Sequence, residues 1–205
     1  IINKKYYLLF FFLLFLTLLF GFYFDEDNLG GAMHDATYHY RISEEFNKNF
    51  YQTFLNFGTG DGDMGTRNSP VFWIFLSFLD EYISYDFIRF LNTLIIFAIA
   101  IVFYKCLLLK YKNIQPYTLI ILSSFIFLSP SLRSLAIWPY SLIWGLFFFI
   151  LSIYNYLKFK GNLNFYKSVI ILINVIIAAY IYPAFSVFFI FFFYEITKQL
   201  KKSQI

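Results

Sequence analysis

The chain has few of the residues from which soluble catalytic and metal sites are built. One of its 205 residues is cysteine, Cys106, so no disulfide can close within the chain and no thiolate cluster can hold a metal ion. It has two histidines, and its sequence contains no His-Glu-His zinc spacing, no glycine-rich phosphate loop after a strand and no recognisable set of Ser, His and Asp. These absences exclude the soluble enzyme classes that depend on such motifs.

Charged residues are also scarce, at 14% of the chain, whereas 60% is hydrophobic and 25% is aromatic. Soluble domains are about 45–50% apolar, so this composition is typical of a membrane protein. The net charge of +4 does not indicate a nucleic-acid partner, because the basic residues flank hydrophobic segments and form no continuous basic stripe. We therefore predict an integral, multi-pass protein whose main surroundings are a lipid bilayer.

The hydrophobic runs predict one all-α, polytopic membrane domain over residues 1–205, incomplete at one or both ends. A first span at 6–24 approaches the ~20 residues needed to cross a bilayer, and a long extracytoplasmic loop at 25–86 follows it. The remaining spans lie within 87–197. About six membrane segments are expected, at 6–24, 87–109, 117–128, 137–157 and in the two halves of 168–197, which turn back at Pro183. Because lysines gather at alternate ends of these segments, the positive-inside rule places both termini in the cytoplasm.

The loop at 25–86 is the long polar segment of the chain, and eight of the twelve acidic residues lie between Asp25 and Pro70. Residues 32–57 carry a helical period of phenylalanines, which predicts one or two amphipathic helices on the membrane surface. A short apolar block from Pro70 to Leu79 is expected to dip into the interface. Together with the turns at 129–133 and 182–183, this loop should meet at one extracytoplasmic face.

Several short motifs resemble one known family. The chain has an acidic loop with Asp35 and Tyr38 three residues apart, then Asn-Ser-Pro-Val-Phe at 68–72 and a span opening with Phe-Ile-Arg at 87–89. Ser-Pro-Ser-Leu-Arg at 129–133 leads to Ile-Trp-Pro at 137–139 and a further span. In this layout the chain resembles the N-terminal part of the polytopic glycosyltransferases with the GT-C fold. The resemblance implies a bacterial inner-membrane enzyme that moves a sugar from a polyprenyl-phosphate donor to a glycolipid or polysaccharide acceptor on the outer face.

For such a reaction a carboxylate must take the proton of the acceptor hydroxyl as it attacks the sugar, and Asp35 is the predicted base. Tyr38 of the same motif is a predicted substrate-binding residue. The family commonly has an acidic pair here, whereas Asp35 follows His34, so the cluster of acids at 25–27 stays open as the alternative source of the catalytic acid.

The leaving lipid phosphate calls for a cation, and Arg133 is the first candidate because a guanidinium can pair with two phosphate oxygens. Arg67 and Arg89 are weaker candidates. Asp25 and Asp27 are the candidate ligands for a divalent metal ion, although no cofactor is strictly required. Other functions remain open: a polysaccharide polymerase or ligase, a transporter or flippase, and a non-catalytic membrane subunit.

Overall fold

The computed structural model describes residues 4–28, 30–59 and 69–202, and all regular elements within these ranges are helical. In chain order they are α1 (Lys4–Tyr23), α2 (Ala32–Lys48), α3 (Phe50–Asn56), α4 (Val71–Asp80), α5 (Tyr85–Lys110), α6 (Pro116–Leu128), α7 (Pro130–Ile137), α8 (Ser141–Phe159), α9 (Phe165–Ile181), the 3-10 helix η2 (Pro183–Ser186) and α10 (Val187–Lys202). The predicted all-α class is therefore confirmed for the described residues.

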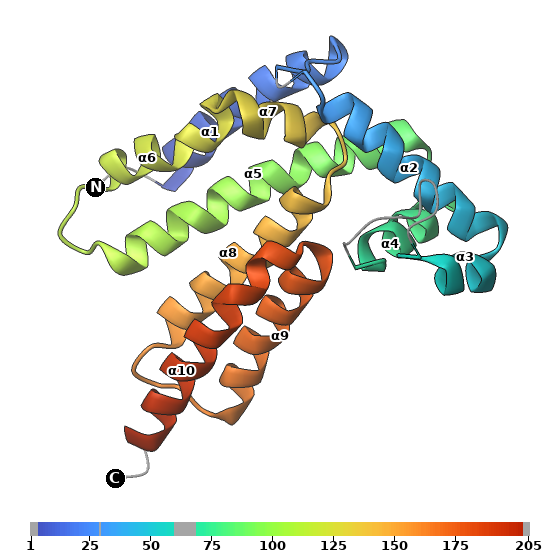
Figure 1. The fold of residues 1–205 in the computed structure, drawn as a ribbon. Helices are drawn as coiled ribbons and strands as arrows, with labels where there is room; N and C mark the ends of the chain where they lie inside the picture. Colours follow the sequence, from blue (N-terminus) through green and yellow to red (C-terminus); the bar gives the residue numbers. More distant parts are fainter. Residues whose placement is uncertain (1–3, 29, 60–68, 203–205) are drawn as a thin grey trace.

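The helices form two groups that meet on α5 (Figure 1). α1, α6 and α7 lie along α5, while α8 crosses it; α9 packs against α8, and α10 packs against α9. α2, α3 and α4 stand near the N-terminal end of α5. The largest cluster of buried apolar side chains lies where α1, α5, α6 and α8 meet, and Phe11, Leu18, Ile99 and Phe127 are fully buried in it. Burying each such side chain contributes roughly 1.5–3 kcal/mol, which holds the first group together.

Two helices are long and apolar enough to cross a membrane. These are α5, with 26 residues, and α8, with 19 residues. α6 and α7 pass the same test only together, as a pair bent by 62°. The described part of the chain thus contains two candidate spans, or three if the bent pair crosses as one, and the six predicted segments stay a prediction.

The bend between α6 and α7 falls at Ser129. Ser129 has extended backbone angles and its hydroxyl accepts a hydrogen bond from the Leu132 amide at 3.5 Å, while Pro130 occupies the first turn of α7. The expected start of a span at residue 137 is wrong, because 130–137 form α7 and α8 begins at Ser141. Pro139 explains the gap, since a proline disfavours helical geometry at the residue before it, and Trp138 is indeed extended.

Polar side chains of α5 complete the C-terminal end of α7. The last carbonyls of a helix have no partner within it, and Asn92 donates to those of Leu135 and Ala136, both at 2.8 Å. Thr93 donates to the Ala136 carbonyl at 3.0 Å. Both side chains are fully buried, so this short helix is fixed on α5 by hydrogen bonds in the interior.

The region predicted as one or two amphipathic helices is two helices. Asn49 separates α2 from α3 by accepting a hydrogen bond from the Gln52 amide at 3.2 Å, as a helix-capping side chain does. Phe46 is buried whereas Phe50 and Phe54 are about half exposed, so the phenylalanines do not all share one environment. The break expected at Pro183 is confirmed, because η2 separates α9 from α10 there.

Candidate functional site

Polar side chains gather where the α1–α2 loop, the N-terminal end of α5, the α7–α8 connection and the α9–α10 turn come together, a region called here the loop end. The lysines at the C-terminal end of α5 and between α8 and α9 lie at the opposite ends of these helices. Of the predicted loops, the first contacts the turn at 129–133 through Arg133, whereas the turn at 182–183 is linked to Tyr140 in the α7–α8 connection.

Arg133 on α7 forms a two-pronged ion pair with Glu26 in the α1–α2 loop. Its Nε and Nη2 donate to Oε1 at 2.7 Å and to Oε2 at 2.5 Å. The remaining donors bond to the hydroxyl and carbonyl of Thr17 on α1 and to the Phe127 carbonyl. The hydrogen bonds from Arg133 lower the pKa of Glu26, against an opposing effect of burial. Every donor of Arg133 is thus engaged, and a phosphate could bind it only by replacing Glu26.

Arg89 at the start of α5 is similarly engaged. Its side chain is 9% exposed, and it donates to Asp25 at 2.5 Å and to Asp86 at 3.4 Å. The guanidinium carbon lies 3.9 Å from the ring centroid of Trp138, which is a close cation–π contact. Asp25 itself adopts the left-handed conformation, with φ at +52°, which aspartate tolerates better than most residues. Arg89 therefore binds the loop to α5 and is not a free cation.

Asp27 caps α2. Its Oδ1 accepts a hydrogen bond from the Ala32 amide at 3.2 Å, and its Oδ2 accepts one from the Met33 amide at 3.3 Å. The three consecutive acids therefore bind three different helices: Asp25 pairs with Arg89 of α5, Glu26 pairs with Arg133 of α7, and Asp27 caps α2. The described residues contain no group of three or more His, Cys, Asp or Glu side chains arranged for a metal ion, and the divalent cation stays a prediction.

Asp35 differs from these three acids. It lies in the first turn of α2, its side chain is exposed, and no described residue forms a hydrogen bond or ion pair with its carboxylate. Burial raises the pKa of Tyr140 in the α7–α8 connection, and Tyr182 of the α9–α10 turn and the charge of Asp35 raise it further. The charge of this free carboxylate therefore acts on the α7–α8 connection.

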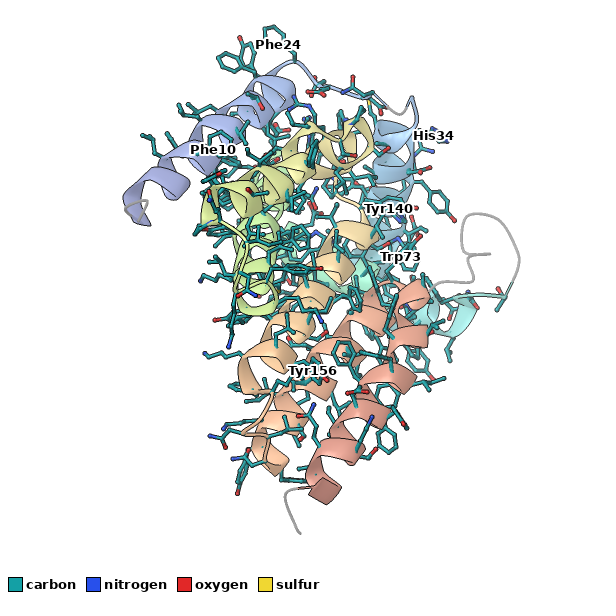
Figure 2. The ribbon with its side chains drawn as sticks, turned by 90° about the vertical axis from the view of Figure 1, so that its left-hand side faces the viewer. Phe10, Phe24, His34, Trp73, Tyr140 and Tyr156 are labelled. Atoms are coloured by element: carbon teal, nitrogen blue, oxygen red, sulfur yellow. The ribbon has the colours of Figure 1, made fainter. Side chains whose placement is uncertain are left out.

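The buried side of α2 positions this carboxylate. His39, one turn after Asp35, is 5% exposed, and its Nδ1 accepts a hydrogen bond from Trp73 Nε1 on α4 at 2.8 Å. Burial lowers the pKa of His39 to about 4, so the ring is neutral at pH 7 and suited to accept. The Tyr140 ring packs edge-on against His39, with centroids 5.0 Å apart. Figure 2 shows His34 on the outer side of α2, and Tyr140 and Trp73 at successive levels below it.

The sequence reasoning missed Arg41. It is exposed on α2 and forms no ion pair with any described residue. The signal was present, since Arg41 is three residues after Tyr38 and seven after His34, which is the spacing of one helix face. Tyr38 is half-buried on that face. Arg67 lies outside the described residues.

The described residues supply an unpaired carboxylate at Asp35, a phenol at Tyr140 whose pKa the charge of Asp35 raises, and an unpaired cation farther along α2 at Arg41. Arg133, Arg89 and the acids at 25–27 hold the α1–α2 loop to its neighbouring helices. The chain matches no family model, no curated protein and no solved structure.

Proposed function

We propose that this chain is a membrane glycosyltransferase that moves a sugar from a polyprenyl-phosphate donor to a lipid-linked or polysaccharide acceptor. The reaction takes place at the loop end, which we assign to the extracytoplasmic face. The observation that carries the proposal is the state of Asp35, which is exposed and unpaired among the described residues while Asp25, Glu26 and Asp27 are all engaged.

A general base must be free to accept a proton, and a carboxylate held by a guanidinium is a weak one, because the ion pair favours its charged form. This argument favours Asp35 over the earlier acids as the residue that deprotonates the acceptor hydroxyl. The charge of Asp35 also acts on Tyr140, whose hydroxyl is a suitable donor or acceptor for a sugar hydroxyl.

The leaving phosphate needs a cation, and Arg133, Arg89 and Arg41 on α2 differ in what they offer. Arg133 and Arg89 would each have to exchange a carboxylate for the phosphate. Arg41 requires no exchange, because it has no ion-pair partner among the described residues. We therefore assign the phosphate contact to Arg41 first, and keep Arg133 as the candidate that acts by exchange with Glu26.

The test is sugar transfer from a polyprenyl-phosphate donor in membranes that contain the protein. Asp35→Asn should lower the rate by about 10² to 10⁴ with unchanged protein abundance, because asparagine keeps the size but cannot accept the proton. Glu81→Gln is the matched control, since Glu81 is an exposed acid at the end of α4 and should leave the rate unchanged. Arg41→Gln should raise the KM for the donor more than it lowers kcat.

Asp27→Asn tests whether the catalytic carboxylate is Asp35 or one of the acids at 25–27. Because Asp27 caps α2, its loss should lower abundance and thermal stability by a modest amount, and any fall in rate should follow the fall in folded protein. Full activity of Asp35→Asn would contradict the proposed mechanism. Loss of activity in fully folded Asp27→Asn would move the catalytic role to the earlier acid.

A further inference from the structure

An apolar groove of about 660 Å³ lies between α5, α8 and α10, away from the loop end. Leu107 on α5, Ile153 on α8 and Phe188 on α10 are among the side chains that line it. Its volume falls within the ~300–1,000 Å³ range of pockets that bind small molecules.

The groove has the length of one leaflet of a bilayer. On α8 its lining extends from Phe149 to Leu157, which is about 12 Å at the helical rise of ~1.5 Å per residue. Half of the ~30 Å hydrocarbon thickness is about 15 Å. On the α10 side Val187 and Phe191 are exposed, at 69% and 54%, so the groove is open to the surroundings there. With α5 and α8 crossing the membrane, an acyl chain from one leaflet can enter from the side.

The polar groups of the groove also fit a lipid. Lys110 is the charged residue of its lining, and it is exposed and without an ion pair to any described residue. Tyr156 offers no free group, because its hydroxyl already bonds to Glu195 at 2.9 Å and to Gln199 at 3.1 Å. Apart from Lys110 and Tyr111 at the end of α5, the lining is apolar or already hydrogen-bonded, which favours a hydrocarbon chain over a sugar or a peptide. The free ammonium of Lys110 favours an anionic headgroup.

We propose that this groove binds an anionic phospholipid of the leaflet at the lysine-rich end, with one acyl chain along α8 and α10 and its phosphate at Lys110. The site is distinct from the proposed reaction, which lies at the opposite end of the helices. The lipid would fill the space between the two helix groups and thereby fix the angle at which α5 crosses α8.

The test is native mass spectrometry of the full chain in a neutral detergent, titrated with phosphatidylglycerol or phosphatidylcholine. Phosphatidylglycerol should bind more tightly, and Lys110→Gln should weaken its binding about fivefold, the effect of losing one lysine near a lipid phosphate. Leu107→Trp and Ile153→Trp should fill the groove and weaken the binding of both lipids. The controls are Lys158→Gln, whose ammonium lies over the rings of its own helix end, and Ile121→Trp on the exposed side of α6.

Equal binding of the two lipids, or an unchanged affinity in Lys110→Gln, would overturn the assignment of the headgroup. Unchanged binding of both lipids in a folded groove-filling variant would overturn the groove as the lipid site. The same spectra report the oligomeric state. A dimer that is lost in the groove-filling variants but insensitive to lipid would show that a second copy of the chain is the occupant, which would also overturn the proposal.

Discussion

Removing the carboxylate of Glu26 should destabilise the fold by about 2 kcal/mol at pH 7. The pair with Arg133 is two-pronged and charge-assisted, and the two side chains are only 17% and 18% exposed. Breaking a fully buried pair costs about 3–5 kcal/mol and a fully exposed one contributes about 0–1 kcal/mol, so a nearly buried pair lies between them. Glu26→Gln leaves the Arg133 cation with neutral acceptors on Thr17 and Phe127.

The assay is thermal unfolding in detergent at several pH values. For a chain of this size about 2 kcal/mol corresponds to a fall in Tm of about 4–8 °C. Because the folded pKa of Glu26 is lowered, its contribution is complete above the unfolded value of about 4.3 and is lost as the pH falls through the folded pKa. The difference between wild type and Glu26→Gln should therefore shrink below about pH 4.

Glu45→Gln is the matched control, because Glu45 and Lys48 form an exposed pair on α2 with side chains 47% and 66% exposed. This variant should unfold at the wild-type temperature. A double-mutant cycle with Arg133→Met isolates the coupling of Glu26 to its partner. A Tm of Glu26→Gln within 1 °C of wild type, or a coupling no larger than that of the control pair, would refute the reasoning.

Three further predictions follow from other contacts. Because the folded pKa of His39 lies below its unfolded value, the wild type should lose on the order of 3 kcal/mol of stability as the pH falls from about 6.5 to about 4. His39→Phe should not show this loss, and unfolding curves across that pH range check this. Gly145→Ala should destabilise the protein by about 1–3 kcal/mol, since the added Cβ would lie 2.9 Å from the ring of Phe185, and Ser152→Ala on the same helix is a control without such a clash. In a cysteine-free background an impermeant reagent should label Thr37→Cys from outside intact cells. The same reagent should label Lys160→Cys only after permeabilisation, and labelling of both from one side would contradict the topology.

The sequence predicted helix ends best where proline sets the local backbone geometry. The turn at Pro183 and the end of α6 at Ser129 were expected because proline lacks an amide hydrogen and restricts the residue before it. The hydrophobic run predicted α5, within two residues at its start and one at its end. It did not predict α7, because eight residues after a bend have too short a pattern to distinguish from the start of the next span.

The candidate site was predictable only in part. Asp35 could be singled out as an acid at the start of a helix, and the contact of the first loop with the turn at 129–133 followed from counting segments. The pairing of Arg133 with Glu26 could not be predicted, because nothing in the local pattern distinguishes an arginine that faces a substrate from one that faces a carboxylate 107 positions away. The same limit applies to Arg89, whose partner Asp25 is 64 positions distant.

That separation of 107 residues sets an order of events during synthesis. At about 5–20 residues per second, Arg133 is made roughly 5–20 s after Glu26. Throughout that interval the first loop contains a carboxylate whose cation does not yet exist, and α1 lacks the donors that later bond to Thr17. The α1–α2 loop and the end of α1 therefore reach their final form only after α7 has been made.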